Sequence, residues 1–354
     1  MSFQTTPIRG RAIRSAPSGP DLAARLRCRV AGQDEAVETI VPYVELFEAG
    51  LSPEGRPVGV FLLLGPTGTG KTRTVEALAE ALHGSERNVL RVDCGEFQLE
   101  HEVAKLIGAP PGYLGHRETH PMISQHKLNA VASERSSLSV ILFDEIEKAA
   151  PSMVRLLLGV LDKASLKLGD NTAVNFERSL IFMTSNLGAR EMEAEFGRRY
   201  GLAGLIHDPA CPGRLDAIGA SAVRRRFSPE FVNRIDRMIT YRPLARPDIE
   251  RILDLQLAAL ERHISTRLGP AAFRLRLTGE AREFLIDRGV SPRYGARELK
   301  RVIHRHIIQP LARLVLDKTV EPGAVVRLEP LSCGSGLRLV VEELVEGEDE
   351  RLAA

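Results

Sequence analysis

The sequence lacks the paired cysteines of a disulfide-stabilised or zinc-binding protein. Its 354 residues contain four cysteines, which are Cys28, Cys94, Cys211 and Cys333. They lie far apart, and none forms a Cys-x-x-Cys pair. This usage favours neither a zinc site nor a disulfide framework, and it suits a reducing cytosol. We therefore expect a cytoplasmic protein.

Long hydrophobic runs and a strong excess of one charge are also missing. The apolar run at residues 58–64 is far shorter than the roughly 20 residues that a membrane-spanning helix needs. Lys and Arg number 48 against 46 Asp and Glu, and a net charge of +2 does not by itself indicate a nucleic-acid-binding protein. We expect no membrane partner and no nucleic-acid partner.

The length allows one large domain and one small domain. We expect a disordered basic leader at residues 1–20, a large domain at 21–240, a small domain at 241–342 and an acidic tail at 343–354. The leader is rich in arginine, proline and glycine and has no acidic residue up to its end, so it can bury little apolar surface. A transit peptide is the alternative interpretation of this leader.

A glycine-rich loop is the most informative part of the chain. It matches the pattern G-x-x-x-x-G-K-[ST] through Gly65, Pro66, Thr67, Gly68, Thr69, Gly70, Lys71 and Thr72. Glycines allow the loop to aim backbone N–H groups at a polyphosphate, Lys71 supplies a cation, and Thr72 supplies a hydroxyl for Mg²⁺. An apolar run precedes the loop and a helical pattern at 72–83 follows it, which favours a phosphate site over an ordinary turn.

Apolar segments alternate with helical patterns in the first two thirds of the chain. The expected strands lie at residues 58–64, 89–92, 139–143 and 179–184. This alternation predicts an α/β fold with a mostly parallel sheet and helices on both faces. Ligands of such sheets bind at the carboxyl ends of the strands, where the glycine-rich loop lies.

The pattern changes after Pro243 and Pro247. Helices are expected at residues 248–268, 279–288 and 296–317, and strands at 273–277, 324–328 and 337–342. These elements predict a compact α+β domain of roughly 100 residues.

Two adjacent carboxylates follow the third expected strand. Asp144 could hold the Mg²⁺ shell through water, and Glu145 could polarise a water molecule for attack on a γ-phosphate. The alternative is a strand that simply runs into a polar turn. The nearby phosphate-loop motif favours the catalytic interpretation.

Several stretches together resemble the AAA+ ATPases of the Clp type, in particular the second ATPase module of ClpB and ClpA. The matching stretches lie at residues 30–37, 65–72, 108–115, 141–148, 183–186, 227–236 and 294–297. They occur in the family's order, and the resemblance covers roughly residues 21–342. It implies a P-loop NTPase large domain, a small C-terminal lid domain, and ATP with Mg²⁺ as cofactors.

The resemblance also implies roles for single residues. Asn186 matches the sensor that orients the attacking water, and Arg234 matches the arginine finger that reaches a neighbouring subunit's nucleotide. Arg297 matches the second sensor, and Val30 and Ala31 match the segment that lines adenine. The alternatives are a turn or helix cap for Asn186, an ion pair with adjacent residues for Arg234, a helix-surface position for Arg297, and plain core for the last two.

One loop resembles the axial pore loop of Clp unfoldases. It consists of Gly112, Tyr113, Leu114 and Gly115, and an aromatic residue between glycines could hold an extended polypeptide. Core packing of Tyr113 is the alternative. The stretches 116–120 and 162–171 depart from the family pattern, which leaves the choice of substrate open. Residues 203–206 resemble the peptidase-docking tripeptide of ClpA, with alanine in place of a larger residue, so a peptidase is a further candidate partner.

We therefore expect an ATP-dependent unfoldase or remodelling chaperone that works as a homo-oligomer, a hexameric ring, on unfolded or misfolded proteins. The resemblance does not imply full disaggregation, because the matching stretches make up one ATPase module. A nucleic-acid-remodelling ATPase is one alternative, which the basic run 224–226 supports. An ATP-binding assembly switch with little turnover is another.

Overall fold

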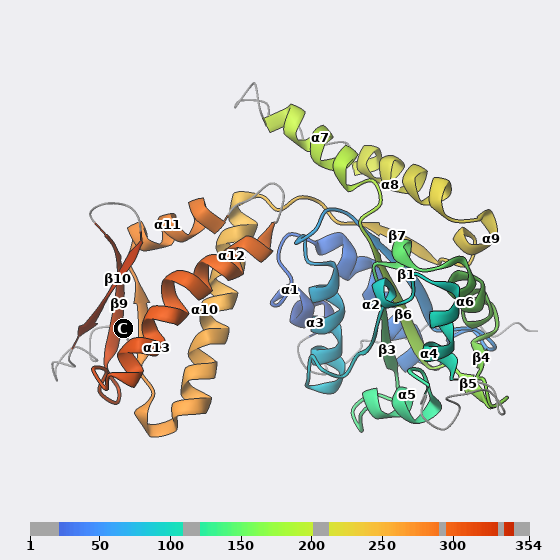
Figure 1. Cartoon of the computed structure of the whole chain (residues 1–354), viewed down its shortest axis with the longest axis horizontal. Coiled ribbons are helices and arrows are strands. Elements are labelled where there is room, and N and C mark those ends of the chain that lie inside the picture. The colour runs from blue at the N-terminus through green and yellow to red at the C-terminus, as the bar shows by residue number, and fades with distance from the viewer. Residues whose placement is uncertain (1–20, 109–120, 201–211, 290–294, 332–335, 343–354) are drawn as a thin grey trace, which may run out of the picture.

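The computed structural model describes residues 21–108, 121–200, 212–289, 295–331 and 336–342 (Figure 1). Within these residues the chain forms a larger and a smaller unit that lie side by side. Two hydrophobic cores belong to the larger unit and extend no further than Tyr241, whereas the third core begins at Leu244. We propose two domains at 21–241 and 242–342, one residue beyond the expected boundary of 240, because Tyr241 packs in the core of the larger unit and no core residue is shared between the two.

A five-stranded sheet forms the centre of the large domain. Its strands are β1 (Gly59–Leu64), β2 (Leu90–Asp93), β3 (Ser139–Asp144), β6 (Ser179–Ser185) and β7 (Arg237–Thr240). The order is β2-β3-β6-β1-β7, and every neighbouring pair is parallel. The expected parallel α/β sheet and its first four strands are confirmed, whereas β7 is an additional edge strand.

The register places the ends of four strands at the same edge of the sheet. Leu64 at the end of β1 lies opposite Ser185 of β6, and Asp93 of β2 lies opposite Asp144 of β3. Because the strands are parallel, the segments that follow β1, β3 and β6 leave the sheet at the same edge. These segments contain the glycine-rich loop, the acidic pair and Asn186.

Helices cover both faces of the sheet, and successive residues of β1 alternate between them. Phe61 and Leu63 join the core beneath α1 (Leu22–Arg27), α2 (Asp34–Glu48) and α3 (Lys71–His83). Leu62 and Leu64 join the core on the opposite face, where α6 (Pro151–Lys163) packs. All six residues of β1 are buried, as expected of a strand with both faces covered.

The remaining elements of the large domain surround this centre. They are α4 (Val103–Ile107), α5 (Gln125–Val131), a hairpin of β4 (Ser165–Lys167) and β5 (Ala173–Asn175), α7 (Ala189–Tyr200), α8 (Pro212–Arg226) and α9 (Pro229–Val232). Helices α7 and α8 lie at the top of the large domain in Figure 1. Among the described residues, no helix is both long enough and apolar enough to cross a membrane.

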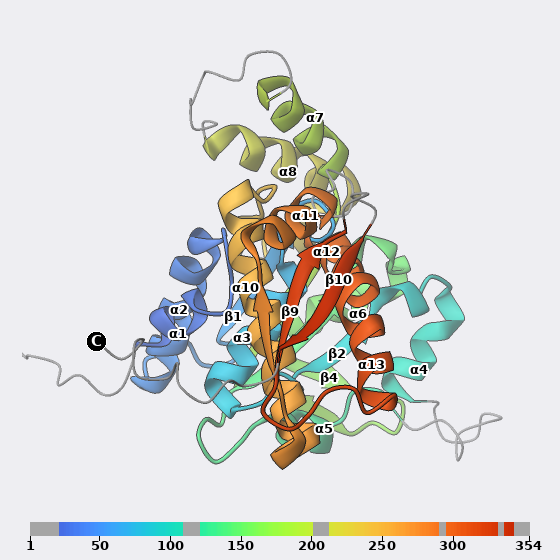
Figure 2. The same cartoon turned by 90° about the vertical axis from the view of Figure 1, so that its left-hand side faces the viewer.

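The small domain combines helices with a short sheet. Its elements are α10 (Arg246–Leu268), β8 (Arg274–Leu277), α11 (Gly279–Gly289), α12 (Ala296–Ile303), α13 (Gln309–Leu316), β9 (Val325–Pro330) and β10 (Leu337–Glu342). The sheet has the order β10-β9-β8, and β9 pairs with β8 in parallel and with β10 antiparallel. Figure 2 shows this sheet in front of the large domain. The helix expected at 296–317 is α12 and α13 joined by one π-helical turn, His304–Ile308.

Candidate nucleotide-binding and catalytic site

The glycine-rich loop connects the buried strand β1 to α3, as its sequence context predicted. Gly65 has a φ of +141°, and a Cβ atom there would lie 2.5 Å from the carbonyl oxygen of Tyr241. Gly70 directly precedes α3 with a φ of +104°. Only glycine adopts such conformations without strain, so the loop can curve tightly before the helix begins. The N-terminus of α3 thereby faces the site with unpaired backbone N–H groups, which favour phosphate.

Lys71 is buried in the loop and bonded on three sides. Its Nζ donates to the carbonyl oxygens of Gly65 and Pro66, at 2.6 and 2.8 Å, and to Oδ1 of Asn186 at 3.0 Å. The pKa of Lys71 is lowered to about 8, mainly by burial; the charge of Glu147 opposes this shift, and the charge of Arg297 adds to it. The ammonium therefore lies in a poorly hydrated position where an anionic phosphate would bind strongly.

Asp144 at the end of β3 is fixed from both neighbouring strands. Its Oδ1 accepts a hydrogen bond of 2.5 Å from the hydroxyl of Thr184 in β6, and its Oδ2 pairs with Arg91 of β2. The carboxylate therefore has one orientation at the edge of the sheet where the phosphate loop lies. Thr72, the other expected Mg²⁺ ligand, is the second residue of α3.

Glu145 occupies a backbone conformation that is unusual for its residue type. Its φ and ψ are 56° and 51°, in the left-handed region, which costs a non-glycine residue about 1–3 kcal/mol. The conformation is held by a 3.0 Å hydrogen bond from the Glu145 N–H to the Thr184 hydroxyl. The carboxylate contacts Lys148 at 2.5 Å and accepts a 3.4 Å hydrogen bond from Nδ2 of Asn186. Asn186 therefore lies between Lys71 and Glu145.

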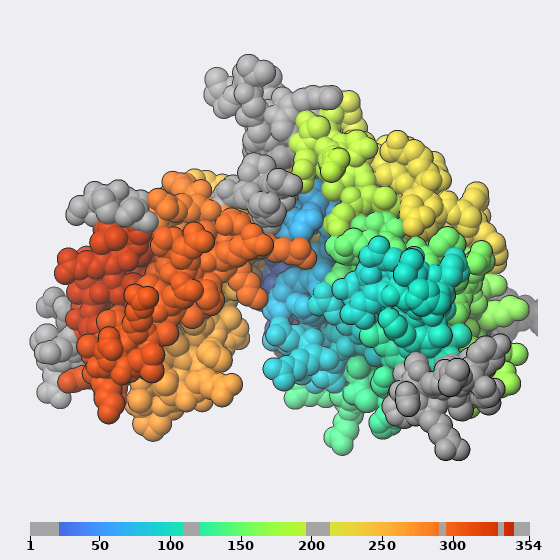
Figure 3. Space-filling model, viewed as in Figure 1, coloured from blue at the N-terminus to red at the C-terminus, as the bar shows by residue number. Residues whose placement is uncertain are grey.

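A cavity of about 770 Å³ lies between the two domains, and Figure 3 shows the cleft that separates them. Predicted site residues that line it are Val30, Ala31, Thr67, Gly68, Thr69, Gly70, Lys71, Thr72, Asp144, Glu145, Asn186 and Arg297. Gly65 and Pro66 lie behind Lys71, which they bind through their carbonyl groups. The size of the cavity and its N–H groups, cation and carboxylates fit a nucleoside triphosphate with its metal ion.

Val30 and Ala31 are almost fully buried, with 5% and 6% of their surface exposed, and still border the cavity.

The nearby Gln33 has a role in the site that the sequence did not reveal. Its Nε2 donates to the carbonyl oxygens of Thr69 and Arg242, at 3.1 and 3.0 Å. Gln33 thereby joins the phosphate loop to the segment that leads into the small domain.

The small domain touches the phosphate loop directly at the start of α12. The N–H of Ala296 donates to the carbonyl oxygen of Gly68 at 3.1 Å. A Cβ atom at Gly295 would lie 2.8 Å from the same oxygen, so the close contact requires glycine. This contact positions Arg297, the next residue of α12, at the wall of the cavity.

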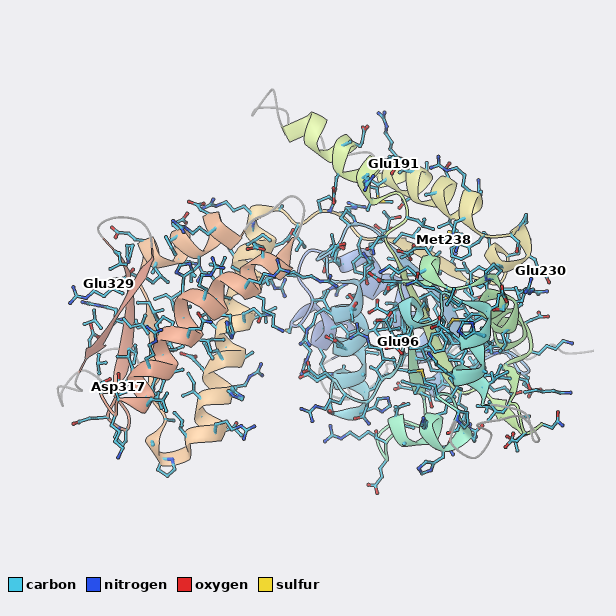
Figure 4. The ribbon with its side chains drawn as sticks, viewed as in Figure 1. Glu96, Glu191, Glu230, Met238, Asp317 and Glu329 are labelled. Atoms are coloured by element: carbon cyan, nitrogen blue, oxygen red, sulfur yellow. The ribbon has the colours of Figure 1, made fainter. Side chains whose placement is uncertain are left out.

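Arg234 does not line this cavity. It follows α9 and forms an ion pair of 2.6 Å with Asp162 of α6. The alternative of an ion pair for Arg234 therefore holds, but with Asp162 as the partner; the adjacent Asp236 instead binds Arg56 at 2.5 Å and the N–H of Val60 at 2.8 Å. Glu230 of α9 lies on the opposite side of the large domain from Asp317 and Glu329 of the small domain (Figure 4).

Four predicted segments lie outside the described residues. They are the basic leader at 1–20, the pore-loop candidate of Gly112, Tyr113, Leu114 and Gly115, the peptidase-docking candidate at 203–206 and the acidic tail at 343–354. Tyr294, which was part of the resemblance, also lies outside them.

The phosphate loop lies between a parallel strand and a helix, an acidic pair and an asparagine end two further strands, and a small domain borders the cavity. These features define a P-loop ATPase of the AAA class. Two family comparisons agree with this class. The AAA domain (Cdc48 subfamily) matches residues 56–238, and the C-terminal, D2-small domain of ClpB protein matches residues 244–328. The chain belongs to the AAA family, as a module like the second ATPase module of ClpB and Hsp104.

Individual relatives support the same assignment. The chaperone protein ClpB of Meiothermus ruber is 40% identical over 305 residues, which are 86% of this chain and 33% of that protein. ClpB of Pseudomonas putida is 41% identical over 301 residues, which are 85% and 32% of the two chains. The chain thus spans about a third of the length of the curated relatives that it matches.

Solved structures of Hsp104 resemble this chain over most of its length. One is a closed-state reconstruction of Hsp104 with ATPγS and FITC casein, with 31% identity and a TM-score of 0.74. The other is the extended Saccharomyces cerevisiae Hsp104:casein complex, with 30% identity and a TM-score of 0.76. Each match covers 90% of this chain and 51% of the other chain.

Proposed function

We propose that the cavity binds ATP with Mg²⁺ and hydrolyses it. Thr72 and Asp144, the latter through water, would hold Mg²⁺, whose charge neutralises the phosphates and orients them. Glu145 polarises the attacking water, and the Asn186 amide beside it orients that water. Lys71 binds the phosphates from inside the loop, and Arg297 binds them from the small domain. The support is that six predicted residues from four separate segments converge on one cavity.

We propose further that hydrolysis requires two copies of the chain. The carrying observation is that Arg234 follows α9, while the cavity lies between the other side of the large domain and the small domain. We infer that a guanidinium on that side of the large domain binds the nucleotide of a neighbouring subunit and not the nucleotide in the cavity of its own subunit. Repetition of such a head-to-tail contact closes into a ring, for which a hexamer is our proposal.

The work of this ring, in our proposal, is the unfolding or remodelling of polypeptides. The Hsp104 structures that resemble this chain contain casein. The loop of Gly112, Tyr113, Leu114 and Gly115 would hold an unfolded segment in the axial pore. We place this activity in the cytoplasm, in keeping with the scarce and dispersed cysteines. The same enzyme could pass substrates to a peptidase through residues 203–206, and co-purification of a peptidase tests that partner.

The nucleic-acid alternative gains no support from the basic run at the end of α8. Arg226 donates to the carbonyl oxygens of Glu147 and Ala149, and Arg225 lies 3.9 Å from Glu191 of α7, which Figure 4 labels. Two of the three arginines are thus engaged within the chain. Arg226 in particular has a structural role, because it holds the turn that follows β3.

Mixing two inactive variants tests the shared active site. Glu145→Gln retains the finger but not the catalytic carboxylate, and Arg234→Ala retains the pocket but not the finger. Each variant alone should lose at least about 100-fold in ATPase rate. An equimolar mixture should regain activity, because about a quarter of the head-to-tail contacts in random rings join an intact pocket to an intact finger. A mixture as inactive as its components, or full activity of a monomer, would contradict the proposal.

A further inference from the structure

Glu147 is an acidic residue of the site that no catalytic role described so far includes. It lies in the short helical turn Ile146–Lys148 that follows β3. Its Oε1 accepts a 3.0 Å hydrogen bond from the main-chain N–H of Asn186. The side chain of Asn186 in turn bonds Lys71 at 3.0 Å and Glu145 at 3.4 Å. One carboxylate therefore fixes the backbone of the residue whose amide lies between the lysine and the catalytic glutamate.

The second carboxylate oxygen of Glu147, Oε2, has an unusual environment. Oε2 is buried and has no hydrogen-bond partner among the described residues. A buried carboxylate oxygen without a partner is costly unless a cation compensates it. Lys71 is the buried cation of this site, and Asn186 connects it to Glu147: the Asn186 side chain accepts from Lys71, and the Asn186 N–H donates to Glu147.

The main chain of Glu147 is held from a third element. Nε and Nη2 of Arg226, the last residue of α8, donate to the Glu147 carbonyl oxygen at 3.1 and 2.8 Å. Arg226 also binds the carbonyl oxygen of Ala149 at 3.3 Å. The turn that carries Glu147 is thus tied to the end of α8, directly before the segment that carries Arg234.

We propose that Glu147 is a positioning residue for ATP hydrolysis, which fixes Asn186 through its main-chain N–H so that the Asn186 amide stays between Lys71 and Glu145. This inference rests on the proposed ATPase function. Glu147 does not touch the reacting atoms itself. It acts through Asn186, so its effect should fall on kcat more than on the KM for ATP and should vanish when the Asn186 amide is absent.

Four variants of the full chain test this role: Glu147→Ala, Glu147→Gln, Asn186→Ala and the Glu147→Ala/Asn186→Ala double variant. Glu147→Ala should lower kcat about tenfold and change KM less than about twofold. Glu147→Gln keeps an acceptor for the Asn186 N–H and should return kcat to within about threefold of the parent rate. The double variant should be no slower than Asn186→Ala, within about twofold.

Glu261→Ala is the matched control. Oε1 of Glu261 accepts a 3.3 Å hydrogen bond from the N–H of Leu275 in the small domain, so the variant removes the same kind of contact away from the site. It should leave kcat unchanged. The melting temperature of every variant is also measured, so that a misfolded protein can be told apart from a folded protein in which Asn186 is no longer positioned. A Glu147→Ala rate equal to that of the parent, no rescue by glutamine, or a further loss in the double variant overturns the inference. An inactive parent protein overturns the proposed function instead.

Discussion

Lys71 is surrounded by acceptors from its own loop before any phosphate arrives. Its ammonium contacts two loop carbonyls and the Asn186 amide, and burial lowers its pKa to about 8. These contacts hold the cation in place, so little conformational entropy is lost when a phosphate replaces one of them. The Lys71 ammonium has already lost most of its hydration in the folded protein. Lys71 is thus preorganised to bind an anion.

A buried histidine predicts how stability changes with pH. His83 is the last residue of α3, and its Nδ1 lies 3.0 Å from the Ser133 hydroxyl. Burial lowers the pKa of His83 below its ordinary value of 6.5, while a backbone hydrogen bond with Leu138 partly opposes the shift. The unfolded chain therefore takes up a proton at a higher pH than the folded chain does. The free energy of unfolding should decrease as the pH falls below 6.5 toward the folded-state pKa.

Urea unfolding at pH 7.5 and pH 5.5 checks this expectation. His83→Gln should reduce the difference between the two free energies of unfolding, because glutamine does not titrate. The exposed His126→Gln is the control and should leave the difference as it is. An unchanged pH dependence in His83→Gln would show that other groups cause the acid sensitivity.

Single residues differ in how well the sequence reveals them. Lys71, Asp144 and Glu145 belong to short motifs whose spacing already carries the chemistry, and the structure brings them into one cavity. Gln33 contacts Arg242, which is 209 positions away in the chain, and no local pattern predicts such a pair. Glu147 was inside a matching stretch, but its bond to Asn186 depends on the pairing of β3 with β6.

At the scale of elements, α12 connects nucleotide chemistry to the small domain. Its first N–H binds the Gly68 carbonyl, and Gly295 before it has a φ of +51°. Both features bring the helix against the phosphate loop. The contact is one hydrogen bond and one close backbone approach, so a small change at this position should alter the docking of the whole domain.

Gly295→Ala should weaken nucleotide binding without unfolding the small domain. The added Cβ would lie 2.8 Å from the Gly68 carbonyl oxygen in a conformation that disfavours alanine. A strain of about 1–3 kcal/mol corresponds to a rise of about 5-fold to 150-fold in the dissociation constant for ATP, measured by calorimetry. Gly279→Ala is the matched control, because nothing lies within 4 Å of a Cβ there, and it should bind ATP normally.

Elements also differ in how well they could be predicted. The strands β1, β3 and β6 are apolar runs with both faces buried, and such runs are visible in the sequence. The strand β7 escaped prediction because it has four residues, begins with the exposed Arg237 and buries only its last two residues. Its place at the edge of the sheet comes from pairing with β1, which is a tertiary interaction.

At the scale of the whole molecule, the cavity belongs to neither domain alone. Residues of the phosphate loop and α3 face residues of α10 and α12 across it. A nucleotide bound there would contact both domains, so we expect its hydrolysis to change the contacts between them. Domain motion driven in this way is the source of mechanical work in our proposal.

Tyr113→Ala should separate this motion from the grip on a polypeptide. Tyr113 lies outside the described residues, so the prediction rests on the family resemblance of its loop. Basal ATPase activity should stay within about twofold of the parent, since the side chain is not part of the catalytic machinery. Unfolding of a fluorescent substrate protein should fall at least about tenfold. Unfolding at the parent rate would remove the proposed role of this loop.

The ion pair between Arg234 and Asp162 has a consequence for how copies of the chain associate. The guanidinium already has a carboxylate partner within its own subunit, at 2.6 Å. In the proposed ring, a neighbour's triphosphate would have to displace Asp162 from Arg234, and the new interaction would link the two copies. Association and ATP affinity should therefore strengthen each other equally, as linkage requires. Rings should accordingly dissociate more readily in ADP and at high ionic strength, where the charge that attracts the finger is smaller or screened.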